Sequence, residues 1–122
     1  MIELKNLCMQ QHKKILKYLL DIDSIIEELD RIIDHHQRDF NDFQQSFISV
    51  RAVERDLMII GEAINKIVQI NPEIQISGTR QIIGLRNLIV HAYDSIEPSV
   101  LWRILVKDIP TLKEEIEEIK KT

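Results

Sequence analysis

The sequence predicts an all-α protein, an up-down bundle of four to five helices. Two observations predict it. The 122 residues contain only three glycines and three prolines, so turns are few and elements are long. Apolar residues also recur at steps of three and four, which is the period of a helix with one buried face. The length suits one domain, residues 1–122, with a modest core, and helices of this kind joined by short loops form a bundle.

The first helix is predicted from about Leu4 to His36. A single apolar stripe runs along it, formed by Ile15, Leu19, Ile22, Ile26, Leu29 and Ile33. The polar stretch from Gln37 to Gln45 is predicted to be a connector with at most one helical turn.

The second helix is predicted from about Ser46 to Ile70, and Asn71-Pro72 ends it because proline cannot continue a helix. Gly61 in its middle costs about 1 kcal/mol relative to alanine, which indicates close approach of another helix. Its apolar stripe consists of Val50, Val53, Leu57, Ile60, Ile64 and Ile67.

The third helix is predicted from about Thr79 to Tyr93, with Ser77 or Thr79 as N-cap. Glu97-Pro98 opens the fourth, because proline is favoured in a first helical turn. Pro110 is expected to kink or split this helix. Thr111 and Glu114 have capping-box spacing, which predicts a restart after the kink.

Composition limits the function classes. No run of residues approaches the roughly 18 apolar residues of a membrane span, and no secretory signal is recognisable, so a cytoplasmic location is expected. Cys8 is the single cysteine, which excludes an internal disulfide. The formal net charge is −4, so any RNA binding requires a local basic patch.

The third predicted helix carries four polar groups in eight residues: Arg86, Asn87, His91 and Tyr93. At about 100° per residue, they fall outside the apolar arc that must face the core. The apolar residues Ile83 and Val90 lie among them, which favours a symmetric homodimer with this face at or beside the seam. Two copies of the motif would then concentrate positive potential in one groove.

These residue types suit cleavage of a phosphodiester. His91 can act as general base or acid, and Arg86 can clamp the phosphate and stabilise the transition state. Asn87 can orient the imidazole or the phosphate, and Tyr93 can stack on a base. With the ribose 2′-hydroxyl as nucleophile, neither a metal ion nor another cofactor is required.

The motif resembles the Arg-x4-His-x-Tyr signature of the HepT-like toxins, within the HEPN superfamily. The similarity covers roughly the whole chain. It includes Arg51-Ala52-Val53-Glu54-Arg55 leading to Ile60-Gly61-Glu62-Ala63, then Gly84-Leu85-Arg86-Asn87, and finally Leu101-Trp102 with Asp108-Ile109-Pro110.

The resemblance implies a homodimeric endoribonuclease, the toxin of a type VII-like toxin–antitoxin system. It also implies a cognate minimal nucleotidyltransferase antitoxin that adds AMP to Tyr93. Such an adduct would place bulk and negative charge beside Arg86. Asp94 departs from the pattern, since many relatives are expected to carry an aromatic residue there.

Simpler interpretations remain open. Arg86 and His91 could be surface groups, Asn87 a surface amide and Tyr93 a packed aromatic at a helix end. Arg51 and Arg55 are either exposed charges or contacts to phosphate. For the whole chain, the alternatives are a non-catalytic nucleotide- or RNA-binding subunit of a nucleotidyltransferase and a purely structural dimer.

The pair His35-His36, with Asp34 and Asp39 nearby, resembles a metal cluster. Adjacent histidines point about 100° apart on a helix, so they chelate poorly. A polar helix end is the better interpretation. Trp102 is expected to pack in the core or an interface rather than to stack on a base.

Overall fold

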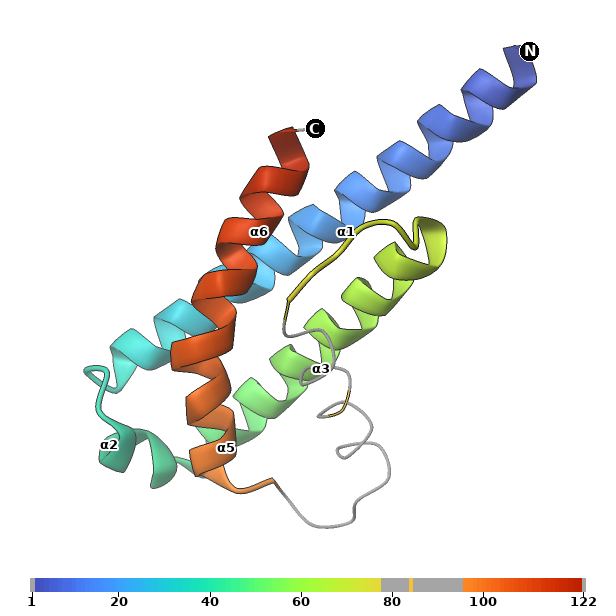
Figure 1. The fold of residues 1–122 in the computed structure, drawn as a ribbon. Coiled ribbons are helices and arrows are strands. Elements are labelled where there is room, and N and C mark those ends of the chain that lie inside the picture. The colour runs from blue at the N-terminus through green and yellow to red at the C-terminus, as the bar shows by residue number, and fades with distance from the viewer. Residues whose placement is uncertain (1, 78–83, 85–95, 122) are drawn as a thin grey trace.

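The computed structural model describes residues 2–77, 84 and 96–121, with side chains from residue 6 onward. Every element in this part of the chain is helical (Figure 1), which confirms the predicted all-α fold. Apart from Gly84, which is helical, the predicted third helix lies outside the described residues. The elements are α1 (Ile2–His35), α2 (Phe40–Gln44), α3 (Phe47–Ile70), α5 (Pro98–Arg103), the π-helical turn η1 (Ile104–Asp108) and α6 (Ile109–Lys121).

The core is built on α1 and α3, which lie side by side in opposite directions while α6 packs across α1 (Figure 1). All twelve apolar positions predicted for the first two helices are buried, Ile15 and Val50 being the most exposed of them at 8%. Burying one such side chain contributes roughly 1.5–3 kcal/mol, so this seam supplies much of the stability. From α5, η1 and α6 the core receives Leu101, Ile104, Leu105, Ile109, Leu112 and Ile116.

The chain leaves α1 through two residues in the left-handed region, Gln37 and Arg38, both at φ 55°. This conformation costs a residue other than glycine roughly 1–2 kcal/mol. The amide of Arg38 donates to the carbonyl of Ile33 at 3.0 Å, and its guanidinium reaches Asp34 at 2.8 Å. These contacts hold the turn without glycine, and the predicted connector contains the one helical turn, α2.

His36 fastens this turn to the core. It is 5% exposed, with Nδ1 2.7 Å from Oδ2 of Asp42 and Nε2 2.6 Å from Oγ of Ser49. Its ring also lies 5.9 Å from that of Phe43, centroid to centroid. One imidazole therefore joins the end of α1, α2 and the first turn of α3. The end of α1 is polar, as predicted, but His36 is buried there while His35 is exposed.

Pro110 does not break the last helix. Instead, the amide of Ile109 donates to the carbonyl of Ile104, five residues back, in the turn η1. A wider turn of this kind accommodates a residue that lacks an amide proton. Thr111 donates its hydroxyl to the carbonyl of Lys107 at 3.4 Å, so the predicted restart at Thr111 was wrong. Helix α6 continues directly from Ile109.

Trp102 is partly buried and packs against the core, as expected. Its ring lies 5.7 Å from that of Phe40 and 5.4 Å from that of Phe43. This aromatic group joins α5 to α2. Among the described residues, no helix is both long and apolar enough to cross a membrane.

Replacing His36 with alanine is expected to lower the free energy of unfolding by roughly 2–3 kcal/mol, because two hydrogen bonds and a buried ring are lost. Urea denaturation followed by circular dichroism measures it. His35→Ala removes the exposed neighbouring imidazole and serves as the control, with an expected change below about 0.5 kcal/mol. Equal effects of the two variants would contradict the role given to His36.

Candidate functional site

The four residues of the predicted centre, Arg86, Asn87, His91 and Tyr93, lie outside the described residues. Their roles therefore stay predictions. The structure does describe α3, which carries the two further arginines that were considered for RNA binding.

Arg51 is engaged within its own helix. Its Nη1 lies 3.1 Å from Oε2 of Glu54, and its guanidinium lies 5.2 Å from the centroid of the Phe47 ring. The side chain of Arg51 is half exposed, whereas that of Glu54 is buried. A phosphate could therefore reach Arg51 only in competition with a carboxylate that is already in place.

Arg55 lies one helical turn further along and is exposed. Residues four apart share a helix face, so Arg51 and Arg55 lie on the same side of α3. Both retain access to solvent, which is compatible with contacts to phosphate and equally with exposed charges.

Two buried carboxylates on α3 escaped the sequence analysis. Glu54 is 6% exposed and Asp56 is 4% exposed, and neither Oε1 of Glu54 nor Oδ2 of Asp56 has a hydrogen-bond partner. Burial, and after it the nearby carboxylate of Glu28, raises the pKa of Asp56 to about 6, and the charge of Arg55 opposes both effects. An unpaired buried carboxylate is costly, so Asp56 weakens the α1–α3 seam at neutral pH.

The helical period of the sequence already indicated that Asp56 lies close to the buried face of α3. At 100° per residue, Asp56 projects roughly 20° from Ile67 and 40° from Ile60. Asp56 therefore borders the apolar arc of α3 at its Ile67 edge, although it is charged. Glu54 gives a weaker signal at the other edge of that arc.

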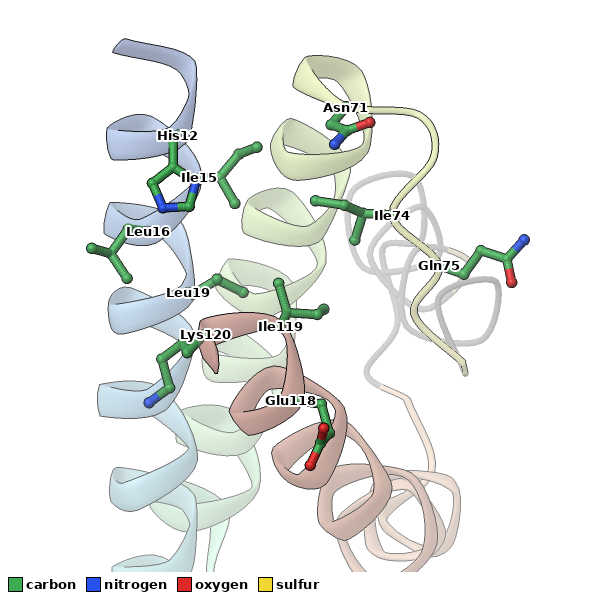
Figure 2. A pocket seen from close by; sticks show the side chains of 10 residues that line it. All are labelled: His12, Ile15, Leu16, Leu19, Asn71, Ile74, Gln75, Glu118, Ile119 and Lys120. Atoms are coloured by element: carbon green, nitrogen blue, oxygen red, sulfur yellow. The ribbon is translucent and has the colours of Figure 1, made fainter. Parts of the chain in front are cut away.

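A cavity of about 420 Å³ opens elsewhere, between α1, the end of α6 and the segment after α3 (Figure 2). Its walls are mixed, with aliphatic side chains beside amides and charges. The lining residues are His12, Ile15, Leu16, Leu19, Asn71, Ile74, Gln75, Glu118, Ile119 and Lys120.

The cation at this cavity is already paired. Nζ of Lys120 bonds to Oδ2 of Asp23 and lies 2.9 Å from Oε1 of Glu117. The hydrogen bond to Asp23, followed by that to Glu117, raises the pKa of Lys120. Nearby, the amide of Ser77 donates to Oε2 of Glu115 at 2.7 Å and ties the segment after α3 to α6. Within the described ranges, no three histidine, cysteine or acidic side chains are grouped to hold a metal ion.

The Asp56→Asn variant is expected to be more stable than the wild type at pH 7 by roughly 1–2 kcal/mol. The folded-state pKa of about 6 exceeds the ordinary value of 3.8, so the folded protein binds the proton more tightly. The stability contributed by protonated Asp56 is full below pH 4 and is lost as the pH rises through 6.

Urea denaturation at pH 5 and pH 7 measures this effect. The difference between the two pH values should shrink in Asp56→Asn and persist in Asp21→Asn, which removes an exposed carboxylate from α1. A variant with the pH dependence of the wild type would exclude Asp56 as its source.

Comparisons with known proteins place the whole bundle in one family. The family model described as "Ribonuclease HepT-like" matches residues 15–119. "Probable ribonuclease HepT" of Thermococcus cleftensis is 34% identical over 116 residues, covering 92% of this chain and 98% of its own length.

Two Methanocaldococcus jannaschii proteins named as RNases are also similar. One is 35% identical over 65% of this chain and 73% of its own length, and the other is 32% identical over 89% of each. No solved structure gives a significant match. The family model spans both the α1–α3 seam and the Arg86–Tyr93 segment, so the chain belongs to the HepT-like ribonuclease family.

Proposed function

We propose that this protein is a metal-independent endoribonuclease, the toxin component of a type VII-like toxin–antitoxin system. One observation carries the proposal. The family match over residues 15–119 includes the polar motif Arg86-x4-His91-x-Tyr93, whose residue types suit phosphodiester cleavage. The related proteins named as ribonucleases support the same activity.

In the proposed reaction, His91 takes the proton of the ribose 2′-hydroxyl or returns one to the leaving 5′-oxygen. The 2′-oxygen attacks phosphorus, and Arg86 stabilises the added negative charge. Asn87 orients the imidazole or the phosphate. The products end in a 2′,3′-cyclic phosphate and a 5′-hydroxyl, so no water is consumed in this step.

A homodimer would bring two copies of the motif to one groove. A chain with a formal charge of −4 does not attract RNA in general. In the dimer, however, two copies each of Arg86 and His91 would concentrate positive potential where the phosphate binds. Arg51 and Arg55 would extend that surface along α3. A cytoplasmic location agrees with the single exposed cysteine, Cys8.

The proposed regulator is a cognate minimal nucleotidyltransferase that transfers AMP to the hydroxyl of Tyr93. The phenolic oxygen attacks the α-phosphorus of ATP, and pyrophosphate leaves. The new phosphodiester would bring negative charge and an adenosine close to Arg86, which would exclude RNA.

A non-catalytic RNA- or nucleotide-binding subunit is the second candidate, and the acidic net charge favours it. It predicts binding that depends on Arg86, with no cleavage products.

The decisive experiment is RNA cleavage by purified protein in excess EDTA. Wild-type protein is expected to give cyclic-phosphate ends, and His91→Ala to lose at least 100-fold in rate because proton transfer is removed. His12→Ala, at an exposed imidazole on α1, is the matched control. Equal rates for wild type and His91→Ala would remove His91 from the mechanism, and wild-type binding without products would favour the second candidate.

The modification is tested with the nucleotidyltransferase and ATP, followed by mass spectrometry and the cleavage assay. One added AMP and loss of cleavage are expected for the wild type and for Tyr18→Phe, which removes the other tyrosine. Tyr93→Phe should stay unmodified and resist inhibition. Modification of Tyr93→Phe would show that the acceptor is another residue.

A further inference from the structure

Phe47 places an aromatic ring in solvent at the start of α3. Its exposed fraction is 70%, whereas every other described phenylalanine, tyrosine or tryptophan is buried or partly buried. The neighbouring Ile48 is 80% exposed, so the first turn of α3 presents two large apolar side chains to solvent. Single exposed apolar residues are common on protein surfaces, so the surroundings of the ring decide whether it has a role.

Arg51 lies against this ring. The central carbon of its guanidinium is 5.2 Å from the centroid of the Phe47 ring, which is a cation–π distance. Nη1 of Arg51 also lies 3.1 Å from Oε2 of the buried Glu54. Glu54 anchors the guanidinium and the guanidinium lies against the ring, so the three side chains form one ordered group. Little conformational freedom would be lost when a flat ligand binds to it.

The ring and the guanidinium both offer flat surfaces for stacking. Arg51 covers only part of Phe47, and 48% of the Arg51 side chain is itself exposed. Nucleobases stack on phenylalanine rings and on guanidinium planes. A base inside a duplex has both faces covered by its neighbours, so only an unpaired base can stack here. The arrangement therefore favours single-stranded over double-stranded RNA.

Arg55 supplies a positive charge on the same side of α3. Residues 47, 51 and 55 are spaced by four, so they follow one helix face over roughly 12 Å. Because Arg51 is paired with Glu54, the exposed Arg55 is the better candidate for contact with a phosphate. An aromatic ring beside a cation is the combination that binds unpaired nucleotides, through stacking and through the backbone.

We propose that Phe47 and Arg51 form a stacking platform for an unpaired base of RNA, with Arg55 in contact with the RNA backbone. The proposal rests on the ribonuclease function proposed above, since it concerns how the RNA is held before it is cut. Stacking tolerates every base, so this contact selects unpaired RNA without selecting a sequence.

Fluorescence anisotropy with a short fluorescein-labelled oligouridine tests the platform. All variants carry His91→Ala, so that the RNA stays intact during the measurement. Phe47→Leu is expected to raise the dissociation constant about 10-fold, because leucine keeps the apolar volume but has no π face. Phe47→Trp should bind at least as tightly as the parent protein. Ile48→Ala, at an equally exposed apolar residue, should leave binding unchanged.

The dependence of binding on salt tests the contact to the backbone. Arg55→Gln is expected to reduce the slope of log Kd against log salt concentration by about 0.7, the value for one phosphate contact on a single strand. Phe47→Leu should leave this slope unchanged, because stacking releases no counterions. Circular dichroism checks that each variant retains its helicity.

Three results would each overturn the platform: unchanged binding by Phe47→Leu, equal losses for Phe47→Leu and Ile48→Ala, or equal affinity for the strand annealed to oligoadenosine. Failure of the parent protein to bind oligouridine would overturn it as well. These results are distinct from those of the cleavage assay. Binding that depends on Phe47, in a wild-type protein that gives no cleavage products, would support the platform and contradict the proposed catalysis.

Discussion

The structure depends on the apolar seam between α1 and α3. Each helix contributes a stripe at steps of three and four, and residues such as Leu29 and Leu57 at its centre are completely buried. The other elements attach to this pair: α6 packs across α1, and α2 and α5 contact α3. Packing in this seam also fixes the orientation of Arg51 and Arg55. Because α3 buries one face against α1, the opposite face, which carries these two arginines, is held toward solvent.

One residue of α3 destabilises this seam. Asp56 is buried at the edge of the apolar arc of α3 with one oxygen unpaired, although a residue such as leucine would bury more favourably there. Natural proteins tolerate such costs mainly where function requires them. Glu54 and Asp56 are two buried acidic residues on the helix that also carries Arg51. The electrostatic potential at the surface of α3 therefore depends on buried carboxylates as well as on exposed side chains.

The helical period predicted most of the fold. The buried stripes of α1 and α3, the helix start at Pro98 and the packing of Trp102 were all anticipated, because each follows from local rules. His36 was missed because its burial depends on Asp42 and Ser49, which approach it only after the chain has turned twice. The turn itself gave no glycine signal, since Gln37 and Arg38 adopt left-handed backbone angles. The predicted centre at Arg86 and His91 rests on residue types and family membership, which identify chemistry without giving distances.

The π-helical turn at Ile104–Asp108 has a consequence for the last third of the chain. A turn that closes five residues back accommodates one residue more than a regular helical turn, so everything after it is rotated by up to about 100° about the axis. Glu118 and Lys120 line the cavity beside α1. The direction in which these two side chains point therefore depends on η1 as well as on α6. Insertions or deletions of one residue in this turn would thus change the azimuth of the C-terminal helix while leaving its composition intact.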